Sequence, residues 1–246
     1  YIHVEHIMKN AQEKLSKRNG DASFEDLIAK GYLTEAVVNY IALLGWAPKG
    51  ENEIFSLQEL IEEFDISGLS KSPAIFDPIK LKAINAEYIR RLPVEKFFEY
   101  AKPYIEETVK RTDVDFNVIA EVLHPRTELF TDIPEQVDFI DALPEYELEL
   151  YKNKKMKTDE ETSLIALKEV LPVLEGLNDW NTESIHTTLF ELIEKMGVKN
   201  GYLLWPVRVA LSGKARTPGG AIEIAEIIGK SDSIARIKKG IELLSK

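Results

Sequence analysis

The residues best suited to chemistry are the basic and hydroxyl side chains of one short segment near the start of the chain. Lys14-Leu15-Ser16-Lys17-Arg18 places three cations and a hydroxyl close to Gly20, with no apolar stripe for a core to bury. Ammonium, guanidinium and hydroxyl groups are suitable donors to phosphate oxygens. The segment predicts a polyphosphate-binding loop or, because the pattern is so short, an ordinary solvated basic loop.

Further along, one arginine follows a proline and another precedes a Thr-Pro pair. Pro125 restrains the backbone ahead of Arg126, whose guanidinium could pair with or stack on a base. Arg208 lies in a helix-like run with Trp205, which we expect to pack in the core. Thr217-Pro218 has the composition of a helix start, where free N–H groups bind phosphates. The alternatives are a surface arginine and a plain helix cap.

The elements expected to position these residues are helices, because start signals and apolar residues at helical spacing recur along the chain. Strand signals are limited to Tyr1–Met8 and Glu53–Phe55, so we predict a mainly α fold. The predicted helices run from Thr34 to Gly45, over Leu57–Phe64 after a Ser56/Glu59 capping box, from Asp77-Pro78 through Tyr88, from Pro93 through Ala101, over Phe116–Leu123 after Asp115, over Leu164–Leu174 after a Thr158/Glu161 capping box, from Thr182 to Gly197, from Thr217-Pro218 to Gly229, and from Ser231 through Leu244.

Charge is distributed unevenly along the chain. The net charge is −11, yet ten Lys/Arg against four Asp/Glu give residues 195–246 a charge of +6 and leave −17 on residues 1–194. A basic module on an acidic body can attract a polyanion to one end, although a chance cluster on helical surfaces would look the same. Tyr151–Lys157 holds four lysines in seven residues. We interpret it as an exposed linker rather than a phosphate contact, because short charge runs are usually solvated.

Composition excludes several classes of protein. The 246 residues are 44% hydrophobic and 30% charged, as expected for a globular protein, and no apolar run is long enough to span a membrane. Zero cysteines exclude disulfides and thiolate zinc sites and fit a cytosolic enzyme. His3 and His6 have no third ligand nearby, so we expect no metal site. Because the first residue is Tyr rather than Met, we expect the chain to be a fragment, a processed product or an expressed piece from which a tag was trimmed.

Five segments in order resemble bacterial glutamyl-tRNA synthetases, and the resemblance covers essentially the whole chain. They are the KLSKR loop (similar to the KMSKS-class loop, with Leu15 for the usual methionine), Gly31–Ala36 with Leu43–Trp46, Phe76–Leu81 with Asn85–Arg90, His124-Pro125-Arg126, and Trp205–Gly213 followed by Thr217-Pro218-Gly219. The resemblance implies a helical stem-contact region followed by an all-helical anticodon-binding region of two subdomains. The implied divisions are 1–92 (the end of the catalytic fold with the KLSKR loop and the stem-contact domain), 93–152 and 153–246.

The same resemblance implies roles for individual residues. Lys17 would be the catalytic residue, and Lys14, Ser16, Lys17 and Arg18 would bind ATP. Arg126, Arg208, Thr217 and Pro218 would contact the anticodon. The HIGH-type motif of the family is absent from this chain.

These roles lead to an expected function. The complete ligase would attach glutamate to tRNA(Glu) using ATP and Mg²⁺. This portion would bind tRNA(Glu) in the cytoplasm as a monomer, with no cofactor bound, no DNA or membrane partner, and no aminoacylation on its own. The alternative is a helical protein-interaction module without a nucleic-acid role.

Overall fold

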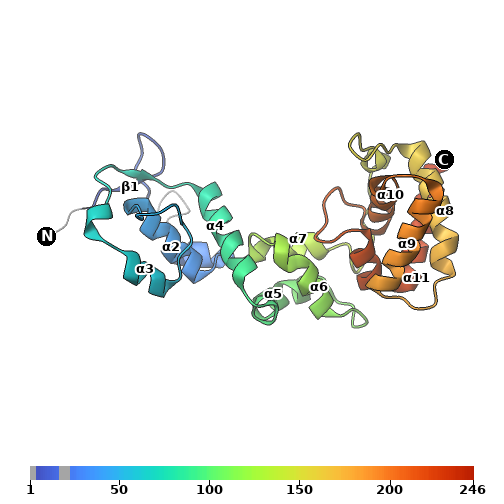
Figure 1. The fold of residues 1–246 in the computed structure, drawn as a ribbon, viewed down its shortest axis with the longest axis horizontal. Coiled ribbons are helices and arrows are strands. Elements are labelled where there is room, and N and C mark those ends of the chain that lie inside the picture. Colours follow the sequence, from blue (N-terminus) through green and yellow to red (C-terminus); the bar gives the residue numbers. More distant parts are fainter. Residues whose placement is uncertain (1–3, 17–22) are drawn as a thin grey trace. The chain divides into compact units, whose positions relative to one another are not determined.

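The computed structural model describes residues 4–16 and 23–246 (Figure 1). These residues form eleven α-helices and one pair of two-residue strands, which confirms the mainly α class. The elements are β1 (Ile7–Met8), α1 (Phe24–Ala29), α2 (Thr34–Gly45), α3 (Leu57–Glu63), β2 (Ala74–Ile75), α4 (Pro78–Arg91), α5 (Val94–Thr108), α6 (Phe116–Leu123), α7 (Ile133–Val137), α8 (Glu160–Glu175), α9 (Thr182–Met196), α10 (Asn200–Ser212) and α11 (Ala221–Leu244). Over the described ranges, none of these helices combines the length and apolarity that a bilayer crossing requires.

The chain forms two compact units. The first comprises residues 1–104 and 124–133, and the second comprises residues 105–123 and 134–246. The chain therefore passes between the units more than once. The three-part division at residues 92/93 and 152/153 stays a prediction.

The first unit is organised around α2 and α4, each of which holds the beginning of the other. The hydroxyl oxygen of Tyr40 on α2 accepts the N–H of Asp77, the residue that caps α4, at 2.6 Å. Asn85 on α4 accepts the N–H of Leu33, directly before α2, at 2.8 Å. The faces that these helices bury against the core carry mainly Ala36, Val37, Tyr40, Leu81, Ile84 and Ile89. A buried amide and a buried phenol thus fix how two amphipathic helices begin.

Strand structure in the first unit is shorter than predicted. Ile7 and Met8 pair in parallel with Ala74 and Ile75, so only the end of the expected Tyr1–Met8 strand is seen within the described residues. The predicted strand at Glu53–Phe55 is wrong. Its carbonyl and N–H groups bond the Asn39 side chain, whose Nδ2 donates to the Glu53 oxygen at 2.7 Å and whose Oδ1 accepts the Phe55 N–H at 2.8 Å. A side-chain amide satisfies this extended backbone without a neighbouring strand.

Capping residues in the sequence predicted several helix ends correctly. Ser56 and Glu59 form the predicted capping box, Asp77 caps α4 ahead of Pro78, and α6 has the predicted bounds. The predicted capping box at Thr158 is wrong by one residue. Asp159 caps α8 and pairs with Thr162, while the Thr158 hydroxyl donates to the Tyr151 oxygen at 2.8 Å.

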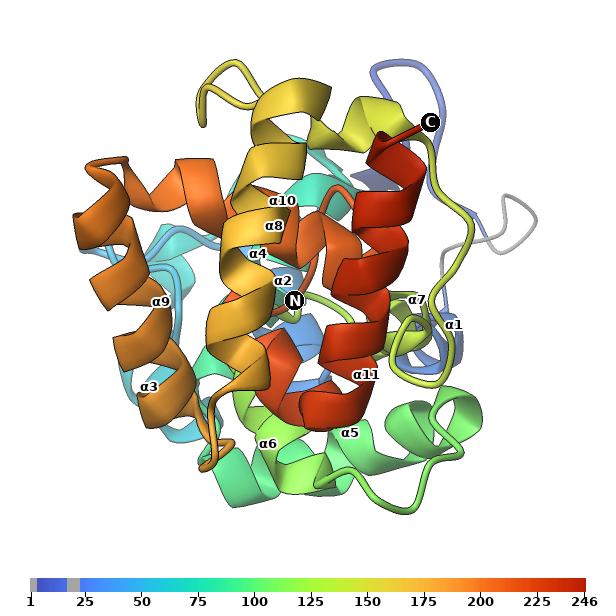
Figure 2. The same ribbon diagram turned by 90° about the vertical axis from the view of Figure 1, so that its right-hand side faces the viewer.

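The second unit is a bundle in which α8, α10 and α11 pack against one another and α9 packs against α8 and α11 (Figure 2). Its core is formed by aliphatic side chains that these helices bury, among them Leu167, Leu189, Leu203, Val207 and Ile237. α11 is kinked at Gly229, which has φ 82° and ψ 167° and stands where the sequence predicted a helix end. Glycine is suited to this position because a positive φ is costly for other residues.

Candidate nucleic-acid interface

Arg208 is held by hydrogen bonds and by ring stacking near the end of α10. Its Nη1 donates to the Thr217 hydroxyl at 3.2 Å, and its Nη2 donates to the Ala215 carbonyl at 2.8 Å. The guanidinium also lies 4.4 Å from the centre of the Trp205 ring. Stacking and hydrogen bonds together fix the plane of the guanidinium as well as its position. Such a group can present an ordered edge to a ligand without first losing side-chain entropy.

Thr217 lies in the loop between α10 and α11, and the predicted helix start at Thr217-Pro218 is wrong. α11 begins at Ala221, and the Glu223 carboxylate accepts the N–H of the N-cap residue Gly220 at 2.9 Å. The Thr217 hydroxyl donates to the Gly219 carbonyl at 2.7 Å while it accepts from Arg208. The hydroxyl therefore connects Arg208 to the loop, and the helix-terminus argument for ligand binding at Thr217 does not apply.

The loop is also fastened to the rest of the second unit. Lys214 pairs with Asp138 at 2.7 Å and donates to the Glu135 carbonyl at 2.7 Å. Pro218 and Gly219 are buried, and the space beside the Gly219 α-carbon is filled by Val122 of α6. The loop is thus shaped by contacts on both sides of Thr217.

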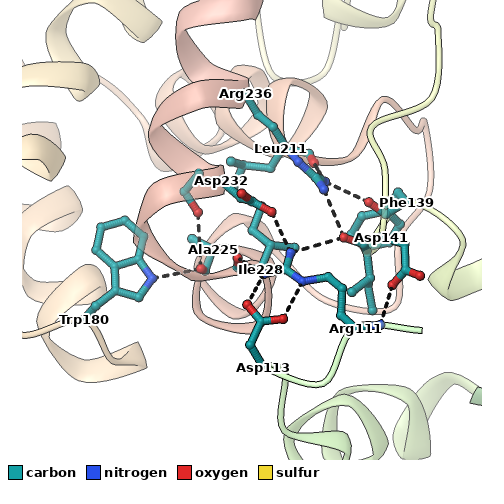
Figure 3. A network of polar contacts seen from close by, with 12 residues as sticks. Arg111, Asp113, Phe139, Asp141, Trp180, Leu211, Ala225, Ile228, Asp232 and Arg236 are labelled. Atoms are coloured by element: carbon teal, nitrogen blue, oxygen red, sulfur yellow. Dashed lines mark hydrogen bonds and ion pairs between the residues drawn. The ribbon is translucent and has the colours of Figure 1, made fainter. Parts of the chain in front are cut away.

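A network of two arginines supports the end of α10 (Figure 3). Arg236 is 7% exposed and donates to the carbonyls of Phe139 at 2.8 Å, Leu211 at 2.7 Å and Ile140 at 3.0 Å. Burial lowers the pKa of Arg236 from its ordinary value, and nearby Asp232 acts in the opposite direction. Because Leu211 follows Arg208 by three residues, Arg236 fixes the backbone that carries the candidate site.

Arg111 joins this network to the segment before α6. It pairs with Asp232 at 2.6 Å and with Asp113 at 2.7 Å, as Figure 3 shows, and it donates to the Ile228 carbonyl at 3.1 Å. The last bond satisfies a carbonyl that the kink at Gly229 leaves outside the helical pattern. Sequence reasoning did not identify Arg111 or Arg236. The only available signal was an arginine beside Ile237 on an otherwise apolar helix face.

Arg126 belongs to the first unit, whereas Arg208, Thr217 and Pro218 belong to the second and are brought together there. Arg126 ends the 3₁₀ turn His124–Arg126 and is exposed. His124 anchors that turn, because its Nε2 lies 2.8 Å from the Ile89 oxygen and its ring centre lies 4.8 Å from that of Phe97.

The loop near the start of the chain is described only in part. Lys17 and Arg18 lie outside the described residues. Lys14 is exposed and forms a single antiparallel bridge with Met8, and the Leu15 N–H donates to the Ile7 oxygen at 3.0 Å. Lys14 and Ser16 line an open pocket of about 560 Å³ with His6 and Ile7. Glu5 lines the same pocket, so an ammonium and a hydroxyl compatible with phosphate oxygens lie beside one carboxylate. Among the described residues, no three His, Asp or Glu side chains lie close enough to hold a metal ion.

Comparison with protein families places two matches side by side along the chain. Residues 96–241 match the family described as the anticodon binding domain, and residues 1–83 match the class I tRNA synthetase (E and Q) catalytic domain. The predicted resemblance is confirmed by curated relatives. The chain is 55% identical over 246 residues to the glutamate–tRNA ligase of Clostridium acetobutylicum and 57% identical over 244 residues to that of Clostridium tetani.

The matches cover 100% and 99% of this chain but 51% and 50% of those relatives, so the chain spans about half their length. Two solved structures are also similar to this chain. The glutamate tRNA ligase of Elizabethkingia meningosepticum, in complex with its amino acid, gives a TM-score of 0.80 at 28% identity over 98% of this chain and 51% of that chain. The glutamate-tRNA synthetase of Elizabethkingia anophelis gives 0.79 at 27% identity, covering 98% of this chain and 50% of that one.

Proposed function

Because this chain belongs to the anticodon-binding domain family, we propose that it binds the anticodon arm of a tRNA, with tRNA(Glu) as its partner. The similarity to glutamate–tRNA ligases along the whole chain carries the proposal. It also disfavours the alternative of a protein-interaction module without a nucleic-acid role. Binding would be recognition of a single-stranded loop, in which unstacked bases meet arginine planes and hydroxyl groups.

Arg208, Thr217 and Pro218 would form the anticodon contact, in which Arg208 and Thr217 offer polar groups to the bases and the buried Pro218 shapes the loop beside them. The stacking on Trp205 and the two hydrogen bonds support this role, because they orient the guanidinium before RNA arrives. A planar guanidinium can pair with a base edge or stack on a base face. Arg126, exposed at the end of its anchored turn, would contact a further anticodon base.

We further propose that the chain is part of a glutamate–tRNA ligase that uses ATP and Mg²⁺. Lys14, Ser16, Lys17 and Arg18 would bind the ATP phosphates, and Lys17 would stabilise the negative charge that develops on the leaving pyrophosphate. Lys14, which is exposed, and Ser16 line one pocket, and an ammonium and a hydroxyl are suitable donors to phosphate oxygens. The ligase would act in the cytoplasm, and one copy of this chain would bind one tRNA. The divisions 1–92, 93–152 and 153–246 belong to the same proposal.

Binding of purified chain to tRNA(Glu), tRNA(Gln) and an anticodon-swapped pair tests the proposal. We expect tRNA(Glu) to bind with a steep dependence on salt, and we expect Arg126→Ala to reduce selectivity between the anticodons. We also expect no ATP–pyrophosphate exchange by this chain alone. Equal binding of all tRNAs by the wild-type chain, or binding that is flat across salt, would contradict the proposal.

A further inference from the structure

The lysine-rich segment Tyr151–Lys157, interpreted above as a linker, is folded as a hydrogen-bonded turn. The backbones of Asn153 and Thr158 exchange two hydrogen bonds, of 2.9 and 3.1 Å. Asn153 Oδ1 also accepts the N–H groups of Lys155 at 3.0 Å and Met156 at 3.1 Å. Lys157 has a positive φ of 59°, which completes the turn. The backbone of the turn is therefore shaped by its own hydrogen bonds, with no ligand required.

The turn is docked on the first turn of α10. A Cβ added to Gly201 would clash with Met156 Sδ, so the absence of a side chain at Gly201 lets the two segments approach closely. One helical turn further on, Trp205 Nε1 donates to the Leu150 carbonyl at 2.9 Å, just before the lysine-rich segment. Gly201, Trp205 and Arg208 have the spacing of residues on one helix face. The turn and Arg208 therefore lie along the same face of α10.

Three lysines surround a pocket where the turn meets α10. Lys155 and Lys157 from the turn and Lys199 from the residue before α10 line a cavity of about 380 Å³, together with Met156 and Tyr202. All three lysines are exposed. Within the described part of the chain, none of them lies within ion-pair distance of a carboxylate, whereas Lys152 in the same segment pairs with Glu149 and Glu160. Like charges gathered without counter-charges repel one another, and an anion in the pocket would remove that repulsion.

We propose that this lysine pocket (Lys155, Lys157 and Lys199) binds backbone phosphates of the RNA strand whose bases meet Arg208. The inference rests on the proposed function and adds a second contact to it. Lysine ammoniums are point charges without the planar geometry that reads a base, so the pocket suits phosphates of any sequence. Lys199 precedes Arg208 by about 14 Å along the helix axis, given a rise of 1.5 Å per residue. One single strand running along α10 can span that distance.

The test compares two triple variants that lose the same charge. Lys155→Gln/Lys157→Asn/Lys199→Gln removes the pocket, with asparagine chosen at 157 because it tolerates a positive φ. Lys168→Gln/Lys239→Gln/Lys246→Gln removes three exposed lysines elsewhere in the second unit. Fluorescence anisotropy with labelled tRNA(Glu) is measured across a KCl series. For three lost phosphate contacts, we expect the slope of log K against log [KCl] to become shallower by about 2 for the pocket triple. For the control triple we expect less than half of that change.

The same measurement separates this inference from the function on which it rests. The pocket triple should keep the wild-type preference between tRNA(Glu) and tRNA(Gln), because phosphates carry no sequence information. Equal slopes and affinities for the two triples, with tRNA binding by the wild type intact, would overturn the lysine pocket alone. Failure of the wild type to bind tRNA would overturn both proposals. Calorimetric binding of inorganic phosphate, with tRNA affinity unchanged in the pocket triple, would assign the pocket to a small anion and overturn the RNA contact.

Discussion

The two ends of α10 carry cationic side chains that are held in different ways. Near its end, Arg208 is stacked on Trp205 and hydrogen-bonded to Thr217 and Ala215. At its start, Lys155 and Lys199 line a pocket and have no carboxylate partner among the described residues. A fixed plane is suited to distinguishing one base from another, and mobile point charges are suited to phosphates of any sequence. On the proposed function, one helix would carry a base-selective contact and a non-selective phosphate contact at separate places.

The largest expected effect comes from removing Arg236, which supports only the end of α10 that carries Arg208. Arg236→Leu should lower the free energy of unfolding by about 3 kcal/mol or more, because it removes the Arg236 donors to the buried carbonyls of Phe139 and Leu211 and leaves the Ile140 carbonyl with only the 3.4 Å bond from Arg111. Urea unfolding measures the change. The exposed residue Arg216 provides the matched control, since Arg216→Leu should change stability by no more than about 0.5 kcal/mol. A loss below about 1 kcal/mol for Arg236→Leu would show that the network does not support α10.

Exchanging arginine and lysine at each end of α10 keeps the charge and tests whether the shape of the cationic group matters. Arg208→Lys should weaken tRNA(Glu) binding by about 1 to 3 kcal/mol and reduce anticodon selectivity, since an ammonium cannot replace a stacked, two-pronged guanidinium. Lys155→Arg at the other end should leave affinity and selectivity nearly unchanged, because only charge is needed there. Binding curves with tRNA(Glu) and tRNA(Gln) provide both readouts. If the two exchanges had equal effects, the distinction between the ends of α10 would be lost.

The lysine-rich turn packs against α10 where Gly201 has no side chain. Gly201→Ala should cost about 1 kcal/mol of stability and weaken tRNA binding slightly, because its methyl group would displace Met156 and the neighbouring lysines. Thermal unfolding and anisotropy measure the two effects. Gly176→Ala is the control, because its Cβ would meet only ordinary contacts at the end of α8. The double variant Gly201→Ala/Met156→Ala should recover part of the loss, and no recovery would argue against this contact.

The smallest expected effect is a pH dependence at the cap of α8, next to the turn. The Thr162 N–H holds the pKa of Asp159 below its ordinary value of about 4. A carboxyl with a lowered pKa in the folded state stabilises the fold above the ordinary pKa, and this contribution is lost as the pH falls through the lowered pKa. Wild type should therefore have a higher Tm than Asp159→Asn at pH 6, and the difference should vanish toward pH 2. A difference independent of pH would exclude this linkage.

Sequence reasoning succeeded where structure is determined by neighbours in the chain. The capping box at Ser56, the Asp77-Pro78 start of α4 and both ends of α6 depend on side chains within a few residues of the backbone that they satisfy. The break at Gly229 follows from the same local logic. These features need no knowledge of the rest of the fold.

It failed where a distant side chain replaced the expected partner. The Asn39 side chain forms the hydrogen bonds that a neighbouring strand would have formed with Glu53 and Phe55. The Thr217 hydroxyl, expected at a helix start, accepts a hydrogen bond from Arg208 instead. The lysine-rich turn was missed because its docking depends on Gly201, more than forty residues later in the chain. The resemblance supplied candidate residues for the site, but only the coordinates place Arg208 and Thr217 in contact.

The bond between Arg111 and Asp232 has a consequence for biosynthesis, because its partners are separated by 121 positions in the chain. A ribosome makes proteins from the amino end, so the segment around Arg111 emerges long before Asp232 exists. Until then, Arg111 has only Asp113 of these two acids within reach. The bond that joins Arg111 to α11 can therefore form only after Asp232 has been synthesised, late in the translation of this unit.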